Sequence, residues 1–167
     1  KEHGGFVTEK GELYTWGNNL YNKLGHEEGN KSSTNRTTTP MSSFERIKFN
    51  KVTKGLENKK IAQFRSGYNH SVCLTEDGEV YTWGLGKDGQ LGHNNFESLK
   101  FPQKVDYFEK NNIKIVEIQL GDYFILALSE DGKMYSWGKN NFGQLGLGHI
   151  TNSFKINTPV EIKMENK

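Results

Sequence analysis

The hydrophobic positions of the chain form short apolar runs, and turn residues separate these runs. HSVCLT (70–75) and FILALS (124–129) are mostly apolar, which is typical of strands that are covered on both faces. Each run is followed by an acidic turn that ends in glycine, TEDG or SEDG, and then by a return strand rich in β-forming residues, EVYTWG or KMYSWG. The pattern predicts antiparallel hairpins and an all-β protein.

The hairpin belongs to a segment that occurs three times. The copies are GELYTWGNNLYNKLG, GEVYTWGLGKDGQLG and GKMYSWGKNNFGQLG, and they begin at Gly11, Gly78 and Gly132. Counted on the tryptophan of each copy, the offsets are 67 and 54 residues. A unit of about four strands that repeats roughly every 50 residues is typical of a β-propeller blade. The sequence therefore predicts about three blades of about four antiparallel strands, with residues 1–167 forming a single partial propeller.

The unequal offsets are explained by one polar segment. The extra residues fall in HEEGNKSSTNRTTTPMSS, which is rich in Ser, Thr and Asn and has no hydrophobic period. Closure entropy grows only slowly with loop length, so a surface loop tolerates such an insertion. We expect a flexible polar insertion at about 27–43, and a phosphorylated segment is the alternative interpretation.

Proline pairs follow each copy of the repeat at similar distances. They are Thr39-Pro40, Phe101-Pro102 and Thr158-Pro159. Because proline has no backbone N–H, it is tolerated at the start of an edge strand. The pairs predict that an outer strand such as PQKVDYF begins at the proline.

The tryptophan and glycine of each copy are expected to be structural. A large indole supplies most of the apolar area between adjacent blades, and its truncation to alanine costs roughly 3 kcal/mol or more. The following glycine lets the backbone turn sharply and lets neighbouring blades approach. This blade signature consists of Trp16, Gly17, Trp83, Gly84, Trp137 and Gly138.

These motifs resemble a known repeat family. G-x-[VL]-Y-x-W-G followed by Q-L-G, with G-x-x-H and A-L/C-L-T-x-D-G upstream, is similar to the regulator of chromosome condensation repeat. The resemblance covers nearly the whole chain outside 27–60 and implies part of a larger, seven-bladed propeller. It further implies a relation to a nuclear guanine-nucleotide exchange factor that acts on the small GTPase Ran and docks on chromatin. The same propeller also occurs in ubiquitin ligases and scaffolds, so the fold does not select one function.

The resemblance places candidate partner contacts at the turn before each inner hairpin. In the exchange factors, acidic and histidine side chains of a G-D-x-H turn face the GTPase. Asp122 matches the acidic position of one turn, and His70 matches the histidine of the other. Tyr68 replaces the acid, and Asn69 completes that turn. Two alternatives remain: His70 is a buried imidazole bonded to a neighbouring blade, and Asp122 caps its turn.

Charge and composition narrow the class of function. The 22 basic and 20 acidic residues nearly cancel, which gives no electrostatic argument for a dedicated nucleic-acid binder. The single Cys73 excludes an internal disulfide and fits a reducing compartment. Neither a membrane-spanning run nor a signal peptide is evident. No zinc spacing, phosphate-binding loop or nucleophile elbow is present, so we expect no catalytic residue, metal site or cofactor.

Two hypotheses of function follow from the sequence. The first is a non-enzymatic protein–protein interaction module, located in the nucleus or the cytoplasm. The alternative is a guanine-nucleotide exchange factor for a Ran-like small GTPase, associated with chromatin. Exchange needs no covalent chemistry, only tighter binding to the nucleotide-free GTPase. Because three blades are too few for a closed ring, we also expect the chain to be a fragment that self-associates or stays partly disordered.

Overall fold

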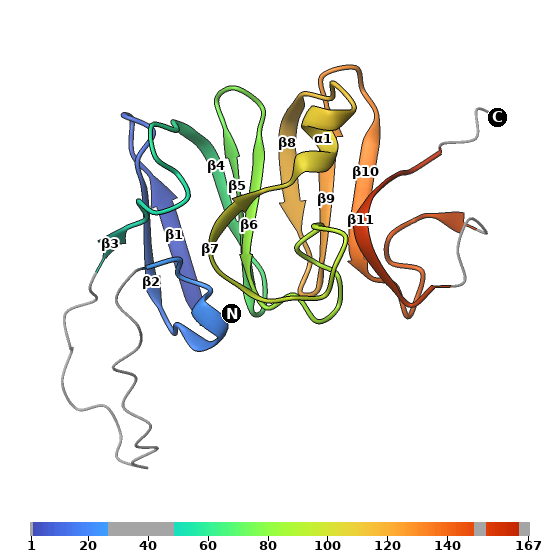
Figure 1. Ribbon diagram of the computed structural model, residues 1–167, viewed down its shortest axis with the longest axis horizontal. Helices are drawn as coiled ribbons and strands as arrows, with labels where there is room; N and C mark the ends of the chain where they lie inside the picture. Colours follow the sequence, from blue (N-terminus) through green and yellow to red (C-terminus); the bar gives the residue numbers. More distant parts are fainter. Residues whose placement is uncertain (1, 27–48, 149–152, 164–167) are drawn as a thin grey trace, which may run out of the picture.

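The computed structural model describes residues 2–26, 49–148 and 153–163, which form three antiparallel sheets arranged side by side in chain order (Figure 1). The first sheet contains β1 (His3–Val7), β2 (Leu13–Gly17) and β3 (Asn50–Lys51), in that order. A single 3₁₀ turn, η1 (Leu20–Asn22), follows β2. The predicted polar insertion at 27–43 lies outside the described residues.

The second and third sheets have four strands each. The second contains β4 (Ile61–Ser66), β5 (His70–Thr75), β6 (Val80–Gly84) and β7 (Leu99–Lys104). The third contains β8 (Ile115–Leu120), β9 (Phe124–Ser129), β10 (Met134–Lys139) and β11 (Lys155–Glu161). In both sheets the spatial order of the strands follows the chain. The predicted all-β class and the blades of about four strands are therefore confirmed.

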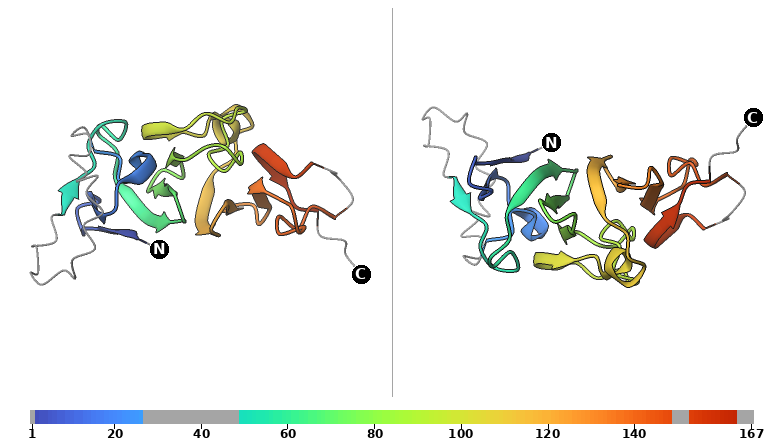
Figure 2. Two further views of the ribbon diagram at one scale, coloured as in Figure 1. Left: turned by 90° about the horizontal axis from the view of Figure 1, so that it is seen from below. Right: turned by 90° about the horizontal axis from the view of Figure 1, so that it is seen from above.

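The blades stack through their inner strands. Figure 2 shows β4 and β8 along one side of the row, and β7 with α1 (Asp106–Lys110) along the other. β1 contacts β4, and β5 contacts β8, so each inner hairpin meets the innermost strand of the next blade. Strands at such a junction are covered on both faces, which explains why β5 is buried at every position.

The predicted hairpins have the expected register. His70 pairs with Gly84 in the second blade, and Phe124 pairs with Gly138 in the third. Gly84 has a φ of +102°, and a Cβ there would lie 2.6 Å from the carbonyl oxygen of Asn69. Glycine is needed at this position because its φ is positive and because the backbone of Asn69 leaves no room for a side chain. Gly138 repeats this geometry.

Trp83 joins the second blade to the first. Its side chain is fully buried, and its indole Nε1 donates a hydrogen bond to the backbone carbonyl of Lys23, at 3.0 Å. A Cβ at Gly25 would lie only 3.0 Å from the same nitrogen. The Lys23-Leu24-Gly25 segment of one blade is thus a seat for the tryptophan of the next, and its glycine makes room for the indole.

The same contact joins the third blade to the second. Trp137 is fully buried and donates to the carbonyl of Gln90, at 3.1 Å. A Cβ at Gly92 would lie 2.8 Å from the indole nitrogen. We call this contact, between a tryptophan and the K/Q-L-G segment of the preceding blade, the tryptophan joint. Trp16 has the equivalent position in the first blade, where it is partly exposed, and Gly17 has a φ of +103°.

Two hydrophobic clusters occupy the junctions between blades. The cluster between the first two blades contains Leu13, Val52, Leu56, Ile61, Cys73, Tyr81 and Trp83. The cluster between the last two contains Val72, Leu74, Val80, Val105, Phe108, Ile115, Ile118, Ile125, Ala127, Tyr135 and Trp137. Complete burial also raises the pKa of the Cys73 thiol, so this side chain remains protonated and acts as a small apolar residue.

The outer strand differs from its prediction. Pro102 lies within β7 rather than at its start, and the segment that was expected to continue the strand forms α1 instead. β7 is the outermost strand of its blade, and its pairing with β6 is irregular between Thr82 and Gly84. Such an edge position tolerates a residue without an N–H. Buried Phe108 anchors α1 in the cluster between the blades.

Candidate functional site

The two candidate turns have the same construction. One connects β4 to β5 and the other connects β8 to β9, at the end of the blades opposite the β5–β6 hairpin turn. In each turn the glycine N–H donates to the carbonyl three residues along, from Gly67 to His70 and from Gly121 to Phe124, both at 2.9 Å. The ring of the fourth residue folds back onto the glycine, and a Cβ on either glycine would overlap that ring. The G-x-x-H and G-x-x-F sequences therefore form turns of the same conformation.

The structure brings the two turns into contact. The backbone N–H of Tyr68 donates to the carbonyl of Asp122, at 3.2 Å. The rings of Tyr68 and Tyr123 lie with their centroids 5.7 Å apart, and the ammonium of Lys139 lies 4.9 Å from the centroid of the Tyr123 ring. Tyr68 is 50% exposed and Asp122 is exposed. We call the surface formed by Tyr68, Asp122, Tyr123 and Lys139 the turn surface.

His70 lies beneath the turn surface and does not form part of it. Its side chain is fully buried, and its imidazole packs against Gly67. A side chain in this position supports the turn, as expected for the alternative of a buried imidazole. Asn69 is also supportive, because its carbonyl accepts the N–H of Leu85 at 2.9 Å.

A buried lysine, which the sequence analysis did not single out, holds one turn from below. Lys23 is 1% exposed, and its Nζ lies 3.2 Å from Oδ1 of Asn69 and 3.4 Å from the carbonyl oxygen of Tyr68. Burial lowers the pKa of Lys23, and the negative charge of Glu2 opposes this shift only in part. The sequence signal was the K-L-G of the first copy, where the other two copies have Q-L-G.

Hydroxyl groups fix the seat segments inside each blade. Thr82, next to the joint tryptophan, donates its hydroxyl proton to the carbonyl of Leu91, at 2.6 Å. Thr15 and Ser136 make the same hydrogen bond in their own blades, to the carbonyls of Leu24 and Leu145. The loop after each W-G is therefore tied to its own β-strand. This tie holds the seat segment in place for the tryptophan of the next blade.

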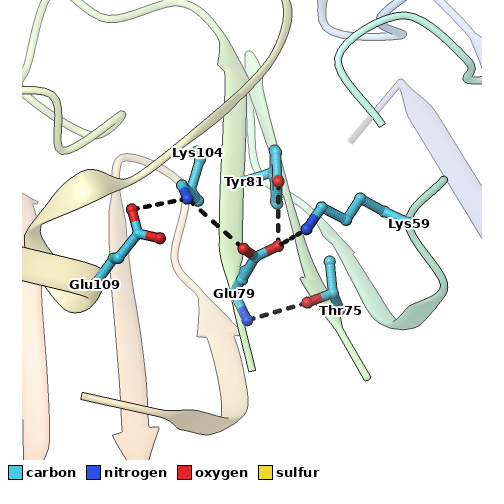
Figure 3. A network of polar contacts seen from close by, with 6 residues as sticks. All are labelled: Lys59, Thr75, Glu79, Tyr81, Lys104 and Glu109. Atoms are coloured by element: carbon cyan, nitrogen blue, oxygen red, sulfur yellow. Dashed lines mark hydrogen bonds and ion pairs between the residues drawn. The ribbon is translucent and has the colours of Figure 1, made fainter. Parts of the chain in front are cut away.

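The opposite end of the second blade carries an ion network (Figure 3). Glu79 forms ion pairs with Lys59 and Lys104, and it accepts a hydrogen bond from the hydroxyl of Tyr81 at 3.2 Å. Lys104 also pairs with Glu109 at 2.8 Å. Partial burial raises the pKa of Glu79, but these partners outweigh that effect, and the pKa lies below its ordinary value. The network links β6, β7 and α1.

The described residues contain no arrangement for metal chemistry or membrane crossing. Among them, no three His, Cys, Asp or Glu side chains are placed to hold a metal ion. None of the described helices is long and apolar enough to cross a membrane. The turn surface offers aromatic faces, one carboxylate and one ammonium, which are groups that occur at protein interfaces.

The sequence of the chain matches the model of a known repeat family over most of its length. The family model described as the regulator of chromosome condensation (RCC1) repeat matches residues 10–74, 77–128 and 131–167. The chain belongs to the RCC1 repeat family. A second RCC1 repeat model matches residues 61–90 and 115–144, which contain the two candidate turns. The resemblance drawn from the sequence motifs is therefore confirmed.

Relatives within the RCC1 repeat family differ in function. The chain is 34% identical over 162 residues to the ultraviolet-B receptor UVR8 of Arabidopsis thaliana, which covers 97% of this chain and 32% of the receptor. It is 32% identical over 148 residues to the human E3 ubiquitin-protein ligase HERC2, which covers 87% of this chain and 3% of the ligase. The chain thus spans a third or less of these relatives, and the matched repeats occur in proteins of unlike activity.

Solved structures share the RCC1 propeller fold. Human WBSCR16 superimposes with a TM-score of 0.77 at 23% identity, covering 99% of this chain and 38% of that one. Prp20p of Saccharomyces cerevisiae, described with its binding to Gsp1p and histones, gives a TM-score of 0.76 at 21% identity. That match covers 99% of this chain and 37% of Prp20p. At this level of identity the likeness establishes the fold alone.

Proposed function

We propose that this RCC1-type chain is a protein-interaction module and that the turn surface makes the contact. The observation that carries the proposal is the direct link between the two turns, from the Tyr68 N–H to the Asp122 carbonyl. It places an exposed tyrosine, a second tyrosine and an exposed carboxylate on one surface. Aromatic residues are enriched at protein interfaces, where they supply large contact areas at low cost in conformational entropy.

Rigidity beneath the surface supports the same proposal. From the preceding blade, Lys23 holds the backbone carbonyl of Tyr68 and the side chain of Asn69. His70 fills the space under the glycine of that turn. A surface that is already ordered loses less freedom on binding, which favours affinity. Because the blades supply this order, the module needs no catalytic group to act as a regulator or scaffold.

The proposal is tested by comparing the proteins that bind three variants. Tyr68→Ala and Asp122→Ala alter the turn surface, whereas Phe96→Ser changes a side chain of similar exposure in a separate loop. Each variant is immobilised, and the bound proteins are measured quantitatively against the parent chain. We expect a partner that is lost with both turn variants and retained with Phe96→Ser. A set of bound proteins that does not change with either turn variant would contradict the proposal.

Guanine-nucleotide exchange on a Ran-like GTPase is the second candidate function. Exposed Asp122 favours it, because an acidic side chain at this turn is the feature that the exchange factors share with this chain. The buried position of His70 and the tyrosine at position 68 do not match that pattern. Release of a fluorescent nucleotide from purified small GTPases, including a Ran-type member, tests this function directly. Faster release that Asp122→Ala abolishes would establish exchange, and unchanged release across the panel would exclude it for those GTPases.

A further inference from the structure

Two blades have a pocket at the same position, at the end of the blade opposite the turn surface. Each pocket lies between the hairpin turn of its blade and the segment that leads to the next blade, which is 52–60 in the first blade and 105–114 in the second (Figure 1). The N–H of Val52 donates to the first hairpin at 2.9 Å, and the N–H of Val105 donates to the second at 2.8 Å. The two pockets can therefore be compared position by position.

The pocket of the first blade is the larger of the two. Its volume is about 370 Å³, and that of the second is about 190 Å³. The first segment buries Leu56 beside its pocket, whereas the second buries the larger ring of Phe108, from α1. Because ligand pockets have volumes from about 300 Å³ upward, the first pocket has room for a ligand group and the second does not.

The charge at the rim also differs between the two pockets. Three lysines line the first pocket, Lys10, Lys51 and Lys59. The second hairpin has Asp77 at the position of Lys10. Glu57, on the same rim as the lysines, accepts a backbone N–H of its own turn at 3.0 Å, so its carboxylate is directed toward that turn. The first pocket therefore favours an anionic group more than the second pocket does.

Ion pairs hold two of these lysines in place. Lys51 pairs with Glu12 at 2.7 Å. Lys59 pairs with Glu79 (Figure 3). An ammonium group has three N–H donors, so each lysine can also bind a carboxylate of a ligand. A group that is already ordered loses less freedom on binding, which favours affinity. The floor beneath this rim is apolar and consists of Leu13, Val52, Leu56 and Ile61.

We propose that the pocket of the first blade binds an acidic peptide segment of a partner protein, and that this segment carries one large apolar side chain. The apolar side chain enters the space beside Leu56, and carboxylates on either side of it meet the ammonium groups of Lys10 and Lys51. The combination of an apolar floor with a basic rim carries this choice of partner. Neither feature alone would require both kinds of side chain in the ligand.

The distribution of charge favours a peptide over a nucleic acid. Glu12 and Glu57 lie among the lysines of the rim, and they would repel a continuous row of phosphates. The apolar floor also gives no hydrogen bond to a phosphate, and such bonds position nucleic acids on proteins. A peptide can place an apolar side chain between carboxylates, which matches the order of groups across the pocket.

The pocket depends neither on the turn surface nor on which faces of the blades are covered. Its lining residues come from 10–13 and 51–61, at the opposite end of the blades from Tyr68 and Asp122. The second blade has a neighbouring blade on each side, and its smaller pocket is still open at the same position. This position therefore stays open when a blade is packed between two others.

Fluorescence anisotropy of labelled peptides tests the inference. The first peptide has one phenylalanine with two glutamates on each side. A second peptide has glycine in place of the phenylalanine, and a third has lysines in place of the glutamates. We expect the chain to bind the first peptide saturably, and to bind it more weakly as salt is added. The second and third peptides should each bind about tenfold more weakly, because each lacks one of the two contributions.

Two variants give the first pocket the character of the second. Leu56→Phe fills the space and should weaken binding of the first peptide about tenfold. Lys10→Asp reverses the charge and should weaken it about fivefold. Lys110→Asp is the matched control, because it makes the same change of charge at an exposed position of α1 outside the pocket, and it should bind like the parent. Circular dichroism verifies that each variant is folded, and Lys10→Asp carries the test if Leu56→Phe is not.

Three outcomes would overturn the inference. The first is the absence of saturable binding of the acidic peptide to the parent chain. The second is an affinity that the folded pocket variants leave unchanged, or that Lys110→Asp lowers as much as Lys10→Asp does. The third is a single-stranded oligonucleotide that binds as tightly and competes with the peptide. Tyr68→Ala and Asp122→Ala should leave the peptide affinity unchanged, so this result does not depend on the function proposed for the turn surface.

Discussion

The ring of Phe64 in the second blade occupies the space that a side chain at Gly5 of the first blade would need. A Cβ at Gly5 would lie 2.6 Å from a ring carbon of Phe64. At the next junction the equivalent positions hold Val72 and Ile118, which belong to one buried cluster. One junction thus combines the smallest residue with a large one, and the other combines two of intermediate size.

This relationship predicts coupled effects of substitution. Gly5→Ala should destabilise the protein by about 1–3 kcal/mol, because the added methyl overpacks the junction. The double variant Gly5→Ala/Phe64→Val should cost less than the sum of the two single changes, because a smaller residue opens the space that the methyl needs. Urea unfolding of the four proteins measures the coupling free energy. Simple additivity would contradict the proposed packing.

The three tryptophans should differ in their contributions to stability. Trp83→Ala opens a cavity at an internal joint and should cost about 3–5 kcal/mol, whereas Trp16→Ala removes a partly exposed ring and should cost about 1 kcal/mol or less. Urea unfolding of both variants measures the two losses. Equal losses would contradict the difference in burial between the two rings.

His93 should make stability depend on pH. The Thr82 hydroxyl donates its proton to Leu91, so the Nε2–H of His93 donates to Thr82 Oγ1, at 2.9 Å. Burial lowers the pKa of His93 to about 4, and the charge of Asp106 opposes this shift. A base with a depressed pKa contributes stability that is fully present above its unfolded value, about 6.5, and is lost as the pH falls toward 4.

Substitution isolates this contribution. Between about pH 7.5 and 4.5 the parent protein should lose roughly 2 kcal/mol more stability than His93→Gln, which does not titrate. The carboxylates titrate in both proteins, so the difference between the two curves reports the histidine. Parallel curves would show that His93 protonates as easily in the folded state as in the unfolded state.

Glu79 should also make the stability of the protein depend on pH, over a more acidic range than His93. Its pKa is depressed in the folded state, so its ion pairs stabilise the protein above its unfolded value and are lost as the pH falls through the folded pKa. Glu79→Gln should therefore be less stable than the parent at neutral pH by on the order of 1 kcal/mol, since the carboxylate is only partly buried. The two proteins should have equal stability in strong acid, as measured by thermal unfolding. A difference that persists there would indicate lost packing instead.

Much of the fold was predictable because the repeats encode it locally. Gly17 and Gly84 end β2 and β6, Gly138 is the last residue but one of β10, and the hairpins have the register that the alignment implies. The α1 segment was not predictable, because the residues after Pro102 include β-forming aromatics. Their helix depends on burying Phe108 between blades, which is a contact between distant parts of the chain.

The candidate site was predictable in position but not in composition. The turns at Tyr68 and Asp122 were found by their motif, yet the motif does not show which of its side chains face solvent. His70 is buried because its ring folds onto Gly67, and Lys23 contributes from a different repeat, 46 residues from Asn69. The contact of Lys23 joins two blades, and a single repeat contains no information about it.

The tryptophan joints also give the chain optical probes in distinct positions. Trp83 and Trp137 lie fully buried between blades, so their fluorescence should report on whether adjacent blades are docked. Trp16 is partly exposed beside Phe6 and Phe49, so its emission should lie at longer wavelength and respond to an external quencher. Replacing the two internal indoles with phenylalanine would leave one emitter at the end of the row. The remaining signal would then follow events at that face alone, without an added label.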